Sequence, residues 1–346
     1  MVGRKQNPGS AAQRVLVIKL SALGDFVLAL GAMRVIREHH PSARLTLLTT
    51  PPYKAFAELC PYVDVVETDG RPEGVKATAA LISRIRKEKF DIIYDLHTSG
   101  RTGNYFKALN MPLRTPPLWS GHAEGSAFFH DNPNRGSMHS IDRLSEQLEI
   151  AGVLEPGTTA AGRSPVPDLT WVTDQLGDRP SHQPEYFGLE EPYMLIIPGA
   201  SAHREAKRWP AERYGELARR IADCGVIPAI IGGKAEGAIA QEIVRAEPRA
   251  KSLVTRTDLF QIVSLARRAL FVVGNDTGPM HMATLSGAPG IALFATSESN
   301  PDQACPRQPD GSEAIVVKDA VLQQVRVDDV WQIVRALGTL PAPQSA

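Results

Sequence analysis

Asp25 follows an apolar run at residues 14–20, where a buried strand gives way to a helix. A carboxylate in that position can cap the helix, or it can act as a general base toward a bound hydroxyl group. The turn contains one glycine, Gly24, where a dinucleotide-binding enzyme would carry GxGxxG. The sequence therefore disfavours an NAD site here and leaves a cap and a general base as the two interpretations of Asp25.

Residues 197–210 (IPGASAHREAKRWP) form a second segment that can bind an anion. Its small residues, among them Ser201, allow backbone N–H groups to approach phosphate oxygens closely. Lys207 supplies a compact positive charge that suits a diphosphate. A basic loop in contact with water explains the same residues, and the sequence does not separate the two interpretations.

Residues 273–286 (VGNDTGPMHMATLS) read as the end of a strand followed by a helix with proline in its first turn. We predict that Asp276 is the N-cap of this helix. The N–H groups of Thr277 and Gly278 would then face an anion at the positive end of the helix. His281 can face the same anion, or it can be a core histidine whose hydrogen bonds are satisfied.

Further candidates for ligand binding lie in both halves of the chain. In the segment GGKAE, Gly232 permits close approach of a nucleoside, and Glu236 can accept hydrogen bonds from ribose or cap a helix. His97, Arg101 and Arg143 lie near predicted loops or helix starts and can meet an anionic acceptor. Surface positions without a ligand explain these three residues as well.

The elements that must position these residues are short strands alternating with helical patterns. Continuous apolar strands followed by amphipathic helices are typical of a parallel sheet covered on both faces. We predict a long loop at residues 111–138, a helix at 140–151 and a short strand at 169–172. The main strands are predicted at residues 14–20, 44–50, 63–67, 90–96, 193–197, 227–231, 252–254, 270–273, 291–294 and 314–317.

Two such series predict two Rossmann-like domains that face each other across a cleft, with the carboxyl ends of the strands directed into it. The predicted division is a flexible tail at residues 1–13, a first domain at 14–175, a linker at 176–192, a second domain at 193–338 and a tail at 339–346.

Composition excludes several classes of function. Lys and Arg together number 38, as do Asp and Glu, so no overall field attracts the chain to nucleic acid. The three cysteines are far apart and form no zinc or disulfide pattern. The polar N-terminus is not a signal peptide, and no apolar stretch reaches about 20 residues. We expect a cytoplasmic protein that does not bind nucleic acid.

Taken together, these segments resemble glycosyltransferase family 9, the heptosyltransferases of lipopolysaccharide core assembly. The resemblance runs from about residue 14 to residue 289 and rests on four motifs in the same order: RVLVIKLSALGDFVLALGAM, PGASAHREAKRWP, GGKAE and GNDTGPMHMATLSGAP. It implies a GT-B fold, in which the first domain binds the acceptor and the second binds the nucleotide sugar. It also implies inverting transfer, with ADP-heptose as the usual donor.

The resemblance also implies roles for the candidate residues. Asp25 is the base, and Lys207 neutralises the departing ADP. His97 stands where many relatives carry Gln, and the loop SAHREA lacks the paired threonines of some members. The sequence therefore differs from the family pattern at the expected acceptor site and at the phosphate contacts. By the same resemblance, Thr277, Gly278 and His281 hold the diphosphate with help from Ser201, and Glu236 matches a position associated with the nucleoside. From the residues themselves, we also expect Asp276 at the diphosphate, Gly232 at the nucleoside, and His97, Arg101 and Arg143 at the acceptor.

The implied partners are a nucleotide-sugar donor and a lipid-linked oligosaccharide acceptor at the inner membrane surface, where the enzyme would be peripheral on the cytoplasmic face. No cofactor and no tightly bound metal are expected, because Lys207 and a helix dipole take the place of a cation. Two alternatives remain open. One is a GT-B protein that uses a UDP- or GDP-sugar as a transferase or an epimerase. The other is a non-catalytic nucleotide-sugar-binding protein.

Overall fold

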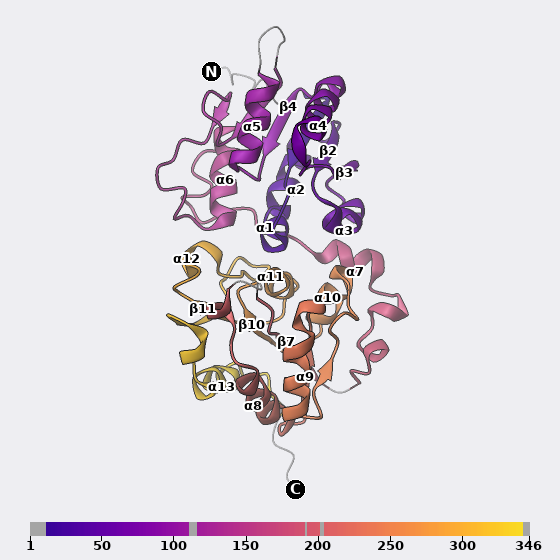
Figure 1. Cartoon of the computed structure of the whole chain (residues 1–346), viewed down its shortest axis with the longest axis vertical. Coiled ribbons are helices and arrows are strands. Elements are labelled where there is room, and N and C mark those ends of the chain that lie inside the picture. The colour runs from indigo at the N-terminus through magenta and orange to yellow at the C-terminus, as the bar shows by residue number, and fades with distance from the viewer. Residues whose placement is uncertain (1–11, 111–115, 191, 201–203, 342–346) are drawn as a thin grey trace, which may run out of the picture. The chain divides into compact units, whose positions relative to one another are not determined.

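The computed structural model describes residues 12–110, 116–190, 192–200 and 204–341. Its contacts divide the chain into two compact units, Met1–Pro167 and Asp168–Ala346. Each unit contains one six-stranded parallel sheet with helices packed against it (Figure 1).

The sheet of the first unit has the order β3-β2-β1-β4-β5-β6. Its central strands are buried along most of their length because helices cover both faces, which explains their unbroken apolar sequences. The strands are β1 (Arg14–Ile18), β2 (Arg44–Leu48), β3 (Val65–Glu67), β4 (Ile92–Asp95), β5 (Leu118–Gly121) and β6 (Phe128–Phe129).

Helices α4 and α5 lie side by side over one face of this sheet, and α6 packs with α1 and α2 (Figure 1). Ile82 of α4 and Phe106 of α5 share a core with Leu16 of β1 and Ile93 of β4. The helices are α1 (Leu23–Leu28), α2 (Leu30–His39), η1 (Pro51–Tyr53), α3 (Lys54–Leu59), α4 (Gly74–Glu88), α5 (Gly100–Leu109) and α6 (Ser140–Ile150).

The sheet of the second unit has the order β12-β11-β10-β7-β8-β9. Its strands are β7 (Tyr193–Ile197), β8 (Ile227–Ile230), β9 (Lys251–Ser252), β10 (Val272–Asn275), β11 (Gly290–Ala295) and β12 (Ile315–Asp319). Helix α8 packs with α9 and α13, whereas α10 packs with α11. The helices are α7 (Thr170–Leu176), η2 (Pro180–His182), η3 (Pro184–Phe187), η4 (Glu205–Lys207), α8 (Ala211–Ala222), η5 (Lys234–Glu236), α9 (Gly237–Ala246), α10 (Leu259–Ala266), α11 (Gly278–Leu285), α12 (Pro301–Ala304), η6 (Leu322–Gln324) and α13 (Val327–Ala336).

The two sheets share one topology. When the strands of each unit are counted from its own first strand, both sheets have the order 3-2-1-4-5-6, which is that of the Rossmann fold. In such a sheet the order reverses between the first and fourth strands, and ligands bind where the loops after these strands diverge. The loops after β1 and β4, and those after β7 and β10, are therefore the places for binding sites.

The structure confirms the α/β fold with two Rossmann-like units and corrects several predicted elements. The predicted loop at residues 111–138 contains β5 and β6, and the predicted strand at 169–172 lies in helix α7 instead. The helix predicted to follow the strand at 14–20 begins at Leu23 and is divided at Ala29 into α1 and α2.

The division between the units differs from the predicted one. Helix α7 and the 3₁₀ helix η2 contact α10, so the second unit begins at Asp168 rather than at 193, and the segment predicted as a linker belongs to it.

Candidate functional site

Asn275, at the end of β10, connects the two loops at the switch point of the second unit. Its Nδ2 donates to the carbonyl oxygens of Pro198 at 2.9 Å and Gly199 at 3.1 Å. The hydroxyl of Tyr214, in α8, donates to Asn275 Oδ1 at 2.9 Å. Asn275 and Tyr214 are fully buried. One amide therefore fixes the loop after β7 against the turn after β10.

Lys207 and Asp276 form a buried ion pair across the same two loops. Lys207 Nζ lies 2.6 Å from Asp276 Oδ2, and the two side chains are 9% and 11% exposed. His281 Nε2 lies 3.8 Å from the other carboxylate oxygen. Burial favours the neutral form of Asp276, but the interactions with His281 and Lys207 outweigh it and lower the pKa of Asp276 to about 2. Asp276 is therefore an anion that neutralises Lys207.

Thr277, not Asp276, is the N-cap of helix α11. The prediction for Asp276 was wrong because its carboxylate bonds to Lys207, and the Thr277 hydroxyl bonds to the carbonyl oxygen of Asn275 at 3.3 Å. Within the described residues, the N–H groups of Thr277 and Gly278 have no acceptor, as expected for a first helical turn without a side-chain cap. They are donors available to an anion.

A pocket of about 400 Å³ opens beside this turn. Glu236, Thr257 and Thr277 provide its polar side chains, and the size falls within the range of small-molecule sites. Its apolar wall consists of Ile197, Ile231, Leu259, Ile262 and Pro279. The pocket thus places an apolar slot next to a carboxylate and free helix N–H groups, an arrangement suited to a nucleotide.

Gly232 makes room for the Glu236 side chain. A Cβ atom at Gly232 would lie 2.7 Å from Glu236 Cβ and 2.9 Å from its Cγ. Glu236 Oε2 accepts the N–H of Gly233 at 2.8 Å, which holds the carboxylate at the pocket. The structure therefore brings together the two residues predicted to bind a nucleoside. Glu236 also occupies the N-cap position of α9.

In the first unit, Asp25 is the third residue of α1 and is half-buried. Its Oδ2 accepts the N–H of Ala22 at 3.3 Å, so one carboxylate oxygen caps the start of the helix. Among the residues that the structure describes, none bonds to the second oxygen, so a cap and a base are compatible at this residue.

Buried charges surround the loop after β4. Lys19 Nζ donates to the carbonyl oxygen of Leu96 at 3.0 Å, and burial lowers its pKa although Asp25 acts in the opposite direction. Burial raises the pKa of Asp95 to about 6, against its hydrogen bonds and the charge of Lys19. Burial, with the charge of Lys19, lowers the pKa of His97 to about 4. His97 is therefore a neutral imidazole at pH 7.

Two arginines lie near the same loop. Arg135 Nη2 donates to the hydroxyl of Thr98 at 3.1 Å. Burial lowers the pKa of Arg135, and the charge of Arg143 adds to this effect. Together with Lys19, these arginines give the loop after β4 a cationic rim suited to an anionic ligand.

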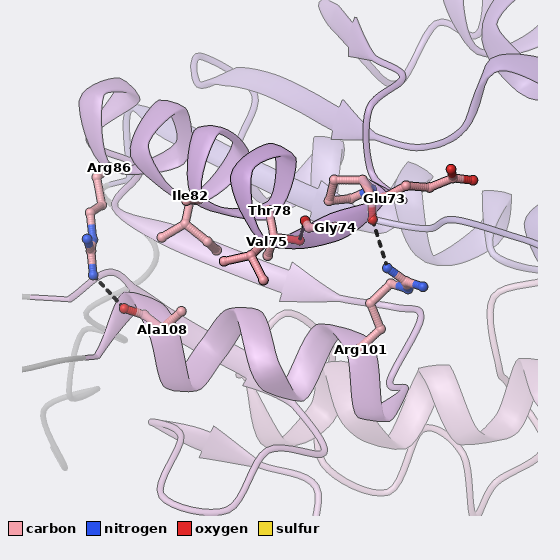
Figure 2. A pocket seen from close by; sticks show the side chains of 10 residues that line it. Glu73, Gly74, Val75, Thr78, Ile82, Arg86, Arg101 and Ala108 are labelled. Carbon is pink, nitrogen blue, oxygen red and sulfur yellow. Dashed lines mark hydrogen bonds between the residues drawn. The ribbon is translucent and has the colours of Figure 1, made fainter.

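Arg101 faces a different part of the unit. Its Nη1 donates to the carbonyl oxygen of Pro72 at 3.3 Å, and its side chain lines a groove between α4 and α5 (Figure 2). Ser201, predicted to assist in phosphate binding, lies outside the described residues.

Sequence reasoning missed four residues of these two sites, three of which are buried. Lys19, Asp95 and Asn275 lie at or just beyond strand ends, and this position is the signal by which they can be found. Arg135 lies within the predicted loop and carries no such signal.

Within the described ranges, no three His, Cys, Asp or Glu side chains cluster as metal ligands do. The same part of the chain contains no helix long and apolar enough to cross a membrane.

Comparison with known proteins gives a consistent result. Lipopolysaccharide core heptosyltransferase OpsX of Haemophilus influenzae is 24% identical over 82% of this chain and 80% of its own. Lipopolysaccharide heptosyltransferase 2 of Escherichia coli is 26% identical over 82% of this chain and 83% of its own. The solved structure of E. coli ADP-heptose LPS heptosyltransferase II superposes with a TM-score of 0.69 at 20% identity, over 94% of this chain and 98% of that one.

The model of glycosyltransferase family 9 (heptosyltransferase) matches residues 78–309. This range includes the loop after β4, the pocket beside α11 and the Lys207–Asp276 pair. The chain therefore belongs to glycosyltransferase family 9 and is a glycosyltransferase with the GT-B fold.

Proposed function

We propose that this protein transfers a heptose from ADP-heptose to an acceptor of the lipopolysaccharide core. The observation that carries the proposal is the Lys207–Asp276 pair at the start of α11, beside a nucleotide-sized pocket. The curated relatives are named for heptosyl transfer to lipopolysaccharide, and the solved E. coli enzyme is named for ADP-heptose. These names support the sugar and the donor.

The donor would occupy the second unit. Adenine would lie against the apolar wall of the pocket, and Glu236 would accept hydrogen bonds from the ribose hydroxyls. The diphosphate oxygens would accept hydrogen bonds from the N–H groups of Thr277 and Gly278 and from Lys207 Nζ. Lys207 and the N-terminus of α11 would then stabilise the charge that develops on the departing ADP. His281 would act through Asp276, which it faces at 3.8 Å.

The reaction would proceed with inversion. Asp25 would accept the proton of the acceptor hydroxyl while that oxygen forms a bond to the anomeric carbon of the heptose. The bond from this carbon to the ADP oxygen would break on the opposite face. The proton remains on the Asp25 carboxyl group, and ADP departs as an anion bound to Lys207. The proposal assigns to Lys207 and α11 the electrostatic role that a metal ion plays in other transferases.

The acceptor would bind at the first unit. Lys19, Arg135 and Arg143 offer positive charge around the loop after β4, which suits an acceptor bearing carboxylates or phosphates. His97, neutral at pH 7, would hydrogen-bond to a sugar hydroxyl. Because this acceptor would be lipid-linked, the transfer would take place at the cytoplasmic face of the inner membrane.

Mass spectrometry of the products tests the proposal. The purified protein is incubated with ADP-heptose and with lipid A–Kdo acceptors of stepwise increasing length. The expected product carries one added heptose on at least one acceptor. Transfer only from a UDP- or GDP-sugar, with thermal stabilisation by UDP or GDP but not by ADP, would favour another donor. ADP binding without transfer to any acceptor would favour a non-catalytic module.

A further inference from the structure

A groove of about 720 Å³ runs between helices α4 and α5 of the first unit (Figure 2). On the α4 side it is lined by Val75, Thr78, Ala79, Ile82 and Arg86, whose spacing of three or four residues places them on one stripe of the helix. From Val75 to Arg86 this stripe is about 16 Å long. The groove is an elongated and mainly apolar channel on the outer side of the helix pair.

Val75 is a large apolar residue that is exposed beside the groove. Its side chain is 86% exposed, the highest value among the large apolar residues of the described chain. It lies in the first turn of α4, directly beside the groove (Figure 2). Exposed apolar surface that adjoins an apolar channel is typical of a site that contacts another molecule.

The helices around the groove carry an excess of positive charge, although Arg84 is ion-paired with Glu67 and Asp69. Helices α4 and α5 contain six Lys or Arg residues and one Glu, whereas the whole chain has 38 basic and 38 acidic residues. Arg86 and Arg101 mark the two ends of the groove, where each donates to a carbonyl oxygen across it, that of Ala108 and that of Pro72. The one acidic residue of the lining, Glu73, directs its carboxylate away from Val75 (Figure 2).

We propose that this groove docks the first unit onto an anionic lipid bilayer, with a lipid acyl chain in the channel and lipid phosphates at Arg86 and Arg101. An apolar stripe flanked by Lys and Arg is the pattern of helices that bind membrane surfaces. The inference rests on the proposed lipid-linked acceptor, because docking would hold the acceptor-binding unit at the membrane that contains it.

The test is co-sedimentation of the full chain with vesicles in the absence of donor and acceptor. We expect binding to vesicles of phosphatidylethanolamine and phosphatidylglycerol and little binding to phosphatidylcholine vesicles. Val75→Asp should lower the partition coefficient about tenfold, and Arg86→Gln should lower it about fivefold. The matched controls are Tyr186→Asp, at an exposed aromatic residue of the second unit, and Arg335→Gln in α13, and both should bind as the wild type does.

A second measurement separates acyl-chain insertion from headgroup attraction. The fluorescence of Val75→Trp should be quenched by vesicles whose acyl chains are brominated, beyond the quenching of the wild-type tryptophans. Binding without this extra quenching would overturn the channel assignment. Absent or equal binding to both vesicle types would overturn the docking itself, as would a change of oligomeric state in Val75→Asp with no change in vesicle binding.

Transfer assays keep this inference distinct from the proposed function. Val75→Asp should act like wild type on a short acceptor without acyl chains and more slowly on an acceptor embedded in vesicles. Vesicle binding by a protein that transfers no heptose would leave the docking intact and overturn the function. Heptose transfer by a protein that binds no vesicles would support the function and overturn the docking.

Discussion

Lys207 Nζ lies 2.6 Å from Asp276 Oδ2, in a pair of side chains that are largely buried. The lysine therefore already has a counter-ion at the position where the diphosphate is proposed to bind. A phosphate that engages Lys207 shares it with Asp276, which stays ionised because its pKa is about 2.

Lys207→Ala should raise the dissociation constant for ADP about 10- to 100-fold, the effect of losing a charged hydrogen bond. The loss includes repulsion, because Asp276 would then face the diphosphate without a counter-ion. Isothermal titration calorimetry measures the change. Lys207→Ala combined with Asp276→Asn should recover part of the affinity. The control is Arg208→Ala, at the exposed neighbouring residue, which should bind ADP nearly as the wild type does. If Lys207→Ala and Arg208→Ala lost the same affinity for ADP, Lys207 would not belong to the site.

Asp25→Asn should lower kcat about 10²- to 10⁴-fold, the usual contribution of a general base, with an unchanged ADP affinity. Asparagine keeps an oxygen that can accept the Ala22 N–H, so the cap is retained and only the base is lost. Asp25→Ala removes both functions and should lower thermal stability in addition. If Asp25→Asn turned over at the wild-type rate, Asp25 would be a helix cap alone.

Gly232→Ala should weaken ADP binding, because the new Cβ would lie 2.7 Å from Glu236 Cβ and displace the carboxylate from the pocket. Gly233→Ala is the matched control. A Cβ there would meet Glu236 Oε2 at 3.5 Å, an ordinary contact, and the backbone N–H would still donate to it. Titration with ADP and with inorganic diphosphate checks the assignment, since only ADP binding should change if Glu236 contacts the nucleoside.

Asn275→Leu should lower both stability and ADP affinity, because the three hydrogen bonds of this buried side chain are lost and the loop after β7 is released. Each unsatisfied buried group costs about 1–3 kcal/mol. Tyr214→Phe removes one of the three bonds but keeps those to Pro198 and Gly199. It should cost about 1 kcal/mol in urea unfolding and leave ADP affinity almost unchanged. Parallel losses of affinity in both variants would show a general effect on folding.

The pH dependence of stability should include a contribution from His40. Its Nε2 lies 2.8 Å from the Tyr94 hydroxyl, and burial, aided by His39 and Arg37, lowers its pKa from 6.5 to about 4. The unfolded chain therefore binds a proton more readily, so this stabilisation is complete above pH 6.5 and is lost as pH falls toward 4. Urea unfolding at about pH 5 and about pH 7 should show a smaller drop for His40→Asn than for wild type. An equal drop would assign the effect to other histidines.

Most of the fold was predictable because buried parallel strands have distinctive sequences. Strand β7, Tyr193–Ile197, was predicted at its observed bounds, since an unbroken apolar run ends at a proline. Strands β5 and β6 were missed because they are short and lie among turn residues, and β6 is also the edge strand of the sheet.

The predicted strand at 169–172 failed for a local reason. The Asp168 carboxylate accepts the N–H of Thr170 at 2.9 Å and so favours a helix start, and Trp171 and Leu176 are buried in the resulting helix α7.

The candidate sites were predictable where all of the residues that form a site lie within one short motif. Gly232 and Glu236 are close in sequence and meet in the structure. The role of Asn275 depends instead on Pro198 and Gly199, more than 70 residues earlier, which adjoin it only because β7 and β10 are neighbours. Asp276 was assigned as a cap because its partner Lys207 lies 69 residues earlier in the sequence.

The shared strand order of the two sheets has a consequence for how this protein changes over evolution. The proposed donor groups and acceptor groups belong to separately folded halves built on one plan, each with its ligand loops after the first and fourth strands. Mutations in the loops after β1 and β4 can alter the accepted glycan while Asn275, Lys207 and the pocket beside α11 keep their internal contacts. A lineage can therefore change its acceptor while it keeps the same nucleotide-sugar donor.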